Sequence, residues 1–286
     1  MVDVLELQRA VVVGAGTMGS GIAQVAARAG LTTKLFDVAP GAAERAIGRI
    51  GDSLSRAVEK GKLTADERTA TLSRLAASAD LDAAAADADL IVEAAPEDLA
   101  LKKALFARLS KAARPNAILG SNTSSLPITE IAAAASHPER VIGLHFFNPV
   151  PVMKLLEIVQ GERTDAAVVI AARALGARMG KEVVVVRDAP GFATSRLGIA
   201  IALEAMRMLE EGVASAEEID RAMELGYGHP MGPLKLTDQV GLDVRLAIAE
   251  HLCRELGERY RPPQILRRMV RAGKLGKKSG EGFYSY

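Results

Sequence analysis

Eight short apolar runs alternate with longer segments of helical period through the first 188 residues of this chain. Several runs are continuous in valine, isoleucine and leucine, which is typical of strands in a parallel sheet covered by helices on both faces. The alternation therefore predicts an α/β domain with a mostly parallel sheet. The expected strands span residues 10–14, 32–37, 76–80, 90–94, 118–120, 141–146, 155–159 and 182–186.

A long helical stretch over residues 39–75 departs from this alternation, and Gly61-Lys62 interrupts it. It predicts a helical hairpin inserted into the crossover between the second and third strands. The sequence Asp-Ala-Pro-Gly at 188–191 favours a turn, and we expect no further strand beyond it. The chain is thus expected to form a sheet-containing domain over residues 1–188 and an all-α domain over residues 189–286, about the two domains that its length suggests.

Three features organise the expected helical domain. Residues 192–211 form an apolar helical segment that Gly212 is expected to end, and Ser215 with Glu218 predicts a capping box for the next helix. Residues 242–256 carry a broad apolar face. These faces could be buried within one chain or against a second copy, and the sequence leaves both arrangements open.

Gly14, Gly16 and Gly19 form a GxGxxG motif directly after the first apolar run and at the start of a helical segment. In this context the first glycine allows a tight turn, the second lets the backbone approach a diphosphate, and the third allows close helix–strand packing. The amides at the helix start bind the anionic group. The motif predicts a Rossmann-type dinucleotide site formed by Gly14, Gly16, Thr17, Met18, Gly19 and Asp37.

Asp37 ends the second apolar run 18 residues after Gly19, close to the position where a carboxylate accepts both ribose hydroxyls. The alternative is an ordinary aspartate that caps the following helix. A carboxylate there would repel a 2′-phosphate, and no arginine follows before Arg45. We therefore predict NAD(H) rather than NADP(H) as the cofactor.

His145 differs from the other three histidines because it ends an apolar run and enters the turn Phe-Phe-Asn-Pro-Val-Pro. The chain then returns through the next expected strand, which contains Glu157. If the two strands are antiparallel, His145 and Glu157 lie opposite or diagonal, and opposite pairs have Cβ atoms about 5 Å apart. A carboxylate fixes the imidazole tautomer and suits it for taking a proton from an alcohol. An unrelated histidine and glutamate are the alternative that spacing alone leaves open.

Several motifs occur in an order and at a spacing that resemble a known family. They are GAGTMGSGIAQ at 14–24, SNTSS at 121–125, HFFNPVPVM at 145–153, PGF at 190–192, HPMGP at 229–233 and KKSGEGFY at 277–284. From about residue 9 onward the chain resembles the L-3-hydroxyacyl-CoA dehydrogenases, a group that includes the bacterial 3-hydroxybutyryl-CoA dehydrogenases. The resemblance implies oxidation of the 3-hydroxyl of an acyl-CoA with NAD, or the reverse with NADH.

The resemblance also implies roles for individual residues. His145 would be the general acid/base, Glu157 its orienting partner, and Ser124 a hydrogen-bond partner of the reacting oxygen near the nicotinamide. Further implied contacts are to the cofactor, from Glu97, Lys102, Asn148 and Lys278, and to coenzyme A, from Ser53 and Lys60. From the sequence alone, ordinary surface or capping roles are open for the four cofactor residues, and a solvated charge at a helix end is open for Lys60.

Ser195 is a departure from the family pattern. The family has an asparagine shortly after the Pro-Gly-Phe turn that helps complete the active site, whereas this chain reads Ala-Thr-Ser-Arg at 193–196. Serine is shorter and offers one hydroxyl in place of an amide. A different contact, room for a water molecule and an altered substrate preference are the three readings left open.

Composition excludes some partners. Lys and Arg total 36 against 35 Asp and Glu, so the formal net charge of +1 predicts neither a nucleic-acid nor an anionic membrane partner. No apolar run approaches the roughly 18 residues of a membrane span. The acidic opening segment does not resemble a signal peptide, and the single Cys253 suits a reducing cytoplasm. We expect a cytoplasmic homodimer acting on an acyl-CoA, with no metal site.

Other functions stay open at this point. Pocket shape sets chain length, so longer or dicarboxylic substrates such as 3-hydroxyadipyl-CoA are alternatives to 3-hydroxybutyryl-CoA. A dehydrogenase of free hydroxy acids or sugar acids would share the nucleotide domain. A crystallin-like protein would retain NAD binding without turnover.

Overall fold

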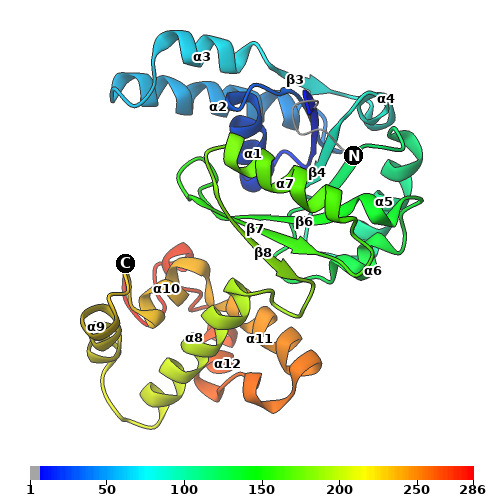
Figure 1. The fold of residues 1–286 in the computed structure, drawn as a ribbon. Helices are drawn as coiled ribbons and strands as arrows, with labels where there is room; N and C mark the ends of the chain where they lie inside the picture. The colour runs from blue at the N-terminus through cyan, green and yellow to red at the C-terminus, as the bar shows by residue number, and fades with distance from the viewer. Residues whose placement is uncertain (1–6) are drawn as a thin grey trace. The chain divides into compact units, whose positions relative to one another are not determined.

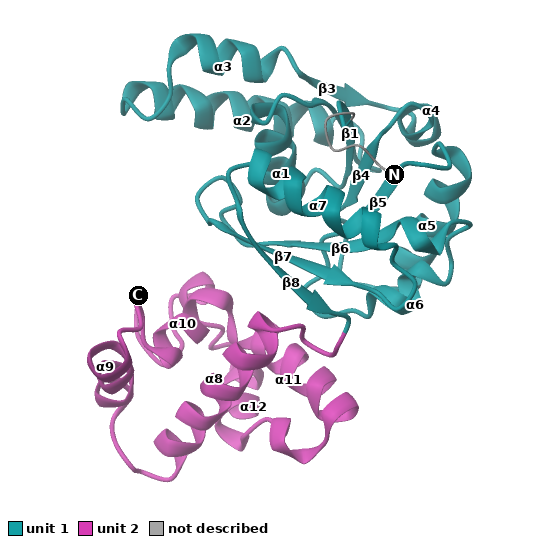
Figure 2. Cartoon of the chain, in the orientation of Figure 1, with its two compact units in different colours: residues 1–188 teal, residues 189–286 magenta. Residues whose placement is uncertain are grey.

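The computed structural model describes residues 7–286, and the chain divides between Asp188 and Ala189 into two compact units (Figure 2). Residues 1–6, which bear on the expectation about a signal peptide, lie outside the described residues. Within 7–286, no helix is both long enough and apolar enough to span a membrane.

The first unit contains a sheet with strand order β3-β2-β1-β4-β5-β6-β7-β8 (Figure 1). Among these strands, only β6 and β7 pair antiparallel. The predicted mostly parallel sheet is confirmed, with strand ends shifted by no more than two residues. The strands are β1 Arg9–Val13, β2 Thr32–Phe36, β3 Leu75–Ser78, β4 Leu90–Glu93, β5 Ile118–Ser121, β6 Val141–Phe146, β7 Leu155–Gln160 and β8 Glu182–Arg187.

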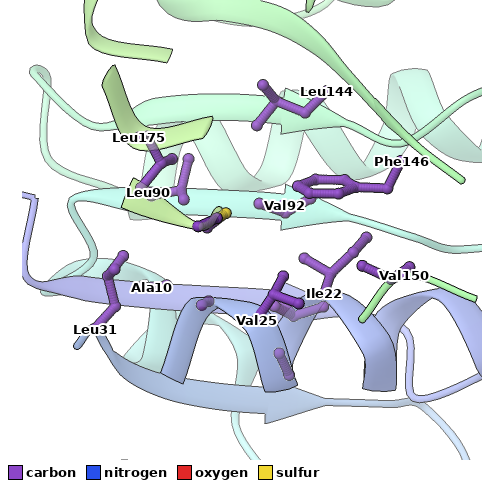
Figure 3. Packing of buried hydrophobic residues seen from close by; sticks show 14 of the residues in the cluster. Ala10, Ile22, Val25, Leu31, Leu90, Val92, Leu144, Phe146, Val150 and Leu175 are labelled. Carbon is purple, nitrogen blue, oxygen red and sulfur yellow. The ribbon is translucent and has the colours of Figure 1, made fainter. Parts of the chain in front are cut away.

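Helices pack against this sheet because alternate strand residues point to the same face. Val92 of β4 and Leu144 of β6 share one buried cluster with Ile22 of α1 and Leu175 of α7 (Figure 3). Each such side chain contributes about 1.5–3 kcal/mol on burial, so this cluster fixes α1 against the sheet just after β1. The helices are α1 Thr17–Arg28, α2 Ala42–Glu59, α3 Ala65–Leu72, α4 Leu81–Ala86, α5 Leu99–Ala112, α6 Ile128–Ala132 and α7 Ala166–Arg178, with a 3₁₀ turn η2 at Pro138–Arg140.

The inserted helical hairpin is confirmed as α2 and α3, which follow β2 and precede β3 in the chain. The two helices pack side by side (Figure 1). Gly61, at φ +65°, follows the end of α2 in a conformation that side chains disfavour. Thr64 then opens α3, since its side chain accepts from the Glu67 backbone N–H while the Glu67 carboxylate accepts from the Thr64 N–H. A glycine turn and a capping box thus define the hairpin.

Helices make up the second unit, as predicted from residue 189 onward. The C-terminal tail, residues 276–286, adds two isolated β-bridges. Ser215 and Glu218 form the predicted capping box, and α8 ends just before Gly212. The Asp238 carboxylate accepts hydrogen bonds from the backbone N–H groups of Phe283 and Tyr284, which fastens the tail. The helices are α8 Thr194–Glu210, α9 Ala216–Tyr227, α10 Pro233–Val240, α11 Leu242–Leu256 and α12 Gln264–Arg271, with 3₁₀ turns η3 Glu258–Tyr260 and η4 Lys277–Ser279.

Asp89 joins the start of β1 to β4 and makes folding pH-dependent. Burial opposes ionisation, but hydrogen bonds from the Gln8 and Arg9 backbone N–H groups and from the Arg9 side chain, with the Arg114 charge, outweigh it and lower the pKa of Asp89. Because the folded pKa is depressed, the stabilisation is present above the ordinary carboxyl pKa of about 4 and is lost as pH falls through the folded value.

We therefore expect wild type to exceed Asp89→Asn in urea stability at about pH 6, and the difference to shrink towards about pH 3. Far-UV circular dichroism suits the measurement because the chain contains no tryptophan. A stability difference that stays constant over this pH range would show that the Asp89 charge is not responsible.

Candidate functional site

The glycine turn after β1 has the geometry that a dinucleotide requires. Gly14 has φ +105°, and a Cβ atom there would lie 2.6 Å from the Ala94 carbonyl oxygen. A Cβ on Gly19 would lie 1.7 Å from the Gly14 carbonyl oxygen, so the helix can pack this closely only on a glycine. Around Gly16, in contrast, an added Cβ would meet no heavy atom within 4 Å. The backbone at Gly16 is therefore open to a diphosphate.

The start of α1 provides donors for such an anion. Gly16 is the N-cap and offers no side-chain oxygen to the amides of the first turn, which begins with Thr17 and Met18. These amides and the positive end of the helix dipole favour a negatively charged ligand. The strand order also brings this turn beside the end of β4, where the sheet reverses its winding and nucleotides bind in open α/β folds.

Asp37 lies at the end of β2 beside the glycine turn. One carboxylate oxygen accepts from the Ala15 N–H at 2.7 Å and the other from the Ala39 N–H at 2.9 Å. Asp37 is not the cap of the next helix, because α2 begins at Ala42 with Gly41 as its N-cap. The carboxylate thus ties the glycine turn to the strand end where a ribose would lie.

His145 and Glu157 lie directly opposite each other on β6 and β7, which confirms the expected antiparallel pairing. The His145 Nδ1 and Glu157 Oε2 atoms are 2.9 Å apart, and the two residues are 7% and 0% exposed. An ionised carboxylate only accepts hydrogen bonds, so Nδ1 carries the proton. The Phe147 ring packs against the imidazole, with centroids 4.4 Å apart. Glu157 and Phe147 therefore hold the buried His145 imidazole in one orientation.

The turn after His145 is held against α1. A Cβ on Gly21 of α1 would lie 2.7 Å from the Val150 Cβ, so this turn packs directly on α1 (Figure 3). Asn122 Oδ1 accepts from the Phe146 N–H at 2.9 Å, which joins the loop after β5 to the end of β6. Asn148 itself is exposed in this turn. The glycine turn and His145 thus belong to one packed assembly.

Ser124 is held by Glu97 in the loop after β5. The Glu97 Oε1 atom accepts from the Ser124 N–H at 3.0 Å, from the Ser124 hydroxyl at 3.2 Å and from the Thr123 hydroxyl at 2.6 Å. The other Glu97 oxygen lies 3.5 Å from the Lys102 ammonium. Three of the residues that the sequence singled out separately therefore form one network.

Glu93, which the sequence analysis did not single out, is the buried centre of this network. Its carboxylate is 2.6 Å from the Lys102 Nζ and accepts from the Ser121 hydroxyl at 2.6 Å. Glu93 and Lys102 are 0% and 1% exposed. The sequence contained a signal that could have identified Glu93, because this residue ends the apolar run Leu-Ile-Val. A carboxylate in a strand covered on both faces requires a buried partner.

The remaining predicted residues lie elsewhere. Ser53 lies on α2 and Lys60 is the C-cap of the same helix, seven residues later, a spacing of about two turns that places both on one side of the helix. Ser195 lies in the first turn of α8, and Lys278 donates to the Asp243 carboxylate, both in the second unit. The structure therefore assembles the predicted residues of the first unit around the ends of β1, β2, β4, β5 and β6, with the exception of Ser53 and Lys60.

Two family models match consecutive parts of the chain. The model described as 3-hydroxyacyl-CoA dehydrogenase, NAD binding domain, matches residues 9–189. The model described as 3-hydroxyacyl-CoA dehydrogenase, C-terminal domain, matches residues 191–286. Together they span nearly the whole chain and agree with the order of motifs in the sequence.

Individual relatives agree with these models. The chain is 48% identical over 283 residues to a probable 3-hydroxybutyryl-CoA dehydrogenase of Bacillus subtilis, covering 99% of this chain and 98% of the relative. It is 46% identical over 284 residues to a 3-hydroxyadipyl-CoA dehydrogenase of Escherichia coli, covering 99% of this chain and 60% of the relative. The crystal structure of (S)-3-hydroxybutyryl-CoA dehydrogenase from Ralstonia eutropha matches with a TM-score of 0.95 at 41% identity, over 98% of this chain and 99% of that one.

Proposed function

The chain belongs to the 3-hydroxyacyl-CoA dehydrogenase family, and we propose that it interconverts (S)-3-hydroxyacyl-CoA and 3-ketoacyl-CoA with NAD(H). Short substrates such as 3-hydroxybutyryl-CoA and acetoacetyl-CoA fit the names of its relatives. The observation that carries the proposal is the buried His145–Glu157 pair, which belongs to the same packed unit as the glycine turn.

NAD binding is assigned to the turn and strand end described above. The backbone of Gly14, Gly16 and Gly19, with the amides at Thr17 and Met18, would hold the diphosphate, and Asp37 would accept the adenosine ribose hydroxyls. When bound at these residues, NAD would supply the hydride acceptor for the hydrogen on C3, and NADH would supply the hydride for the reverse direction. The chain's own residues must then handle only the proton of the hydroxyl.

His145 is the residue that handles that proton. With Nδ1 bound to Glu157, proton exchange with the substrate oxygen falls to Nε2. The imidazole takes the hydroxyl proton during oxidation and returns a proton to the ketone oxygen during reduction. Glu157 keeps the tautomer and stabilises the imidazolium, since its buried carboxylate lies 2.9 Å from the ring that becomes charged.

Ser124 is proposed to hydrogen-bond the reacting oxygen. Glu97 fixes its backbone and hydroxyl, while Lys102 holds Glu97 from the buried side. We thus assign Lys102 and Glu97 to positioning of the loop beside the nicotinamide. Asn148 and Lys278 are proposed as further cofactor contacts, Ser195 as the residue that completes the active site, and Ser53 and Lys60 as contacts to coenzyme A. The Lys60 cation suits a coenzyme phosphate.

The proposal includes a cytoplasmic homodimer. On α8 and α9, a groove of about 240 Å³ has a lining that includes Ile201, Met208, Ile219 and Met223. Exposed apolar side chains in the same unit include Leu197, Leu225 and Tyr227, and association with a second copy would remove such side chains from water. A light-scattering mass equal to one 30.1 kDa chain would overturn the dimer.

The proposed cytoplasmic location is supported by the cysteine content. The chain has a single cysteine and so forms no intramolecular disulfide, which suits a reducing compartment.

The decisive test is loss of reduced-nicotinamide absorbance with acetoacetyl-CoA, run in parallel with NADH and NADPH and with free acetoacetate as the control. We expect rapid loss with NADH and the thioester, and a much lower kcat/KM with NADPH because Asp37 repels the 2′-phosphate. Faster turnover of the free acid would favour a hydroxy-acid dehydrogenase. NADH binding without turnover of any acyl-CoA would favour a non-catalytic protein.

A further inference from the structure

Arg49 is a cation of α2 that reaches the glycine turn. Its Nη2 atom donates to the Ala15 carbonyl oxygen at 3.2 Å, across 34 positions of the sequence. Among residues 7–286, no other arginine or lysine side chain hydrogen-bonds to residues 14–19, and the Arg49 guanidinium forms no ion pair with a carboxylate. This positive charge therefore belongs to the turn that is proposed to hold the NAD diphosphate.

The packing of α2 determines where this side chain lies. α2 packs against α1, and Ile50, the residue after Arg49, is 2% exposed in the same buried cluster as Ile22 of α1. Arg49 itself is exposed, so the core does not need it to fill space. A guanidinium has five N–H donors, of which the Ala15 oxygen takes one. The core thus fixes the helix, while most of the Arg49 donors are left for a ligand.

The charges around Ala15 give a cation a purpose at this place. The Ala15 N–H binds the Asp37 carboxylate at 2.7 Å, while the Ala15 carbonyl binds Arg49. A bound diphosphate would bring further negative charge close to this carboxylate, and like charges repel. The helix dipole supplies only about half a positive charge at the start of α1. A full positive charge beside the turn would offset the repulsion.

We propose that Arg49 is a further residue of the NAD site and that its charge stabilises the bound diphosphate and balances Asp37. The inference rests on the proposed function. Coenzyme A is the other source of phosphate groups, since Ser53, one turn further along the same side of α2, is proposed to contact it. We assign Arg49 to NAD because its hydrogen bond is to the glycine turn.

NADH binding, followed by a fluorescence titration, tests the charge directly. In Arg49→Met, whose side chain is uncharged, the Kd for NADH should rise about five- to tenfold in about 50 mM salt. The difference from wild type should shrink in about 500 mM salt, because salt screens exposed charges. Arg49→Lys keeps the charge but loses the planar fork, and it should retain most of the affinity.

Competition separates the charge of Arg49 from the shape of the turn. ADP carries a diphosphate and adenosine does not, so Arg49→Met should weaken the displacement of NADH by ADP and leave the displacement by adenosine unchanged. Arg56→Met is the matched control, because Arg56 is exposed on the same side of α2 about two turns away. Its Kd for NADH should stay close to the wild-type value.

The results that would overturn the role of Arg49 differ from those that bear on the proposed function. An unchanged Kd for NADH in Arg49→Met overturns it, and a raised KM for acetoacetyl-CoA in the same variant would assign the cation to coenzyme A. Equal losses for ADP and adenosine would show that Arg49 only holds the turn in shape. Absence of NADH binding by the wild type would contradict the proposed function itself.

Discussion

Replacing His145 with glutamine or alanine is expected to lower kcat for acetoacetyl-CoA by about 10²- to 10⁴-fold, the range that general acid–base catalysis contributes. NADH affinity should change little, because the imidazole is not among the groups assigned to hold the cofactor. Steady-state kinetics with NADH, together with a fluorescence titration of bound NADH, separates the two effects. The expected loss is therefore in kcat and not in cofactor binding.

Two variants sharpen this experiment. Glu157→Gln keeps the shape of the partner but removes its charge, so kcat should fall while the folded structure is retained. His137→Gln is the matched control: the His137 Nδ1 atom also lies 3.2 Å from a glutamate oxygen, on Glu139, but the two side chains are 43% and 44% exposed and lie outside the site. We expect wild-type kinetics from it. Near-normal turnover in His145→Gln would remove His145 from the mechanism.

Replacing Lys102 with methionine is expected to destabilise the protein by about 3–5 kcal/mol. The Glu93 carboxylate would then be left buried at 0% exposure without its cation, whose Nζ lies 2.6 Å away in the wild type. This is a large part of the total stability of a domain, about 5–15 kcal/mol. Urea unfolding followed by far-UV circular dichroism measures the effect directly.

The neighbouring residue provides the control for Lys102. Lys103 pairs with Glu130 at 3.0 Å, but the two side chains are 40% and 48% exposed, so Lys103→Met should cost no more than about 1 kcal/mol. Removing both buried charges, in the double variant Glu93→Gln with Lys102→Met, should cost less than the single Lys102 change. Equal losses in Lys102→Met and Lys103→Met would show that the buried pair is not coupled.

Local sequence determined where the helices and strands of this protein form and which residue types are available for nucleotide binding and proton transfer. The eight strands, the α2–α3 hairpin and the glycine turn follow from contiguous residues, because backbone conformation depends on near neighbours and on the alternation of apolar side chains. His145 and Glu157 could also be paired in advance, since a short connection between two strands leaves few ways for them to meet. Asp37 was found by its fixed spacing from Gly19.

The tertiary structure alone decided which side chains share a partner. Glu97 reaches Ser124 over 27 residues, Glu93 reaches Ser121 over 28, and Gly198 makes room for Arg245 on another helix. No local pattern encodes such contacts, because sheet order and helix packing bring the residues together only after folding. A buried charge requires a partner, and only the folded chain shows that Lys102 has one, the Glu93 carboxylate 2.6 Å from its Nζ atom.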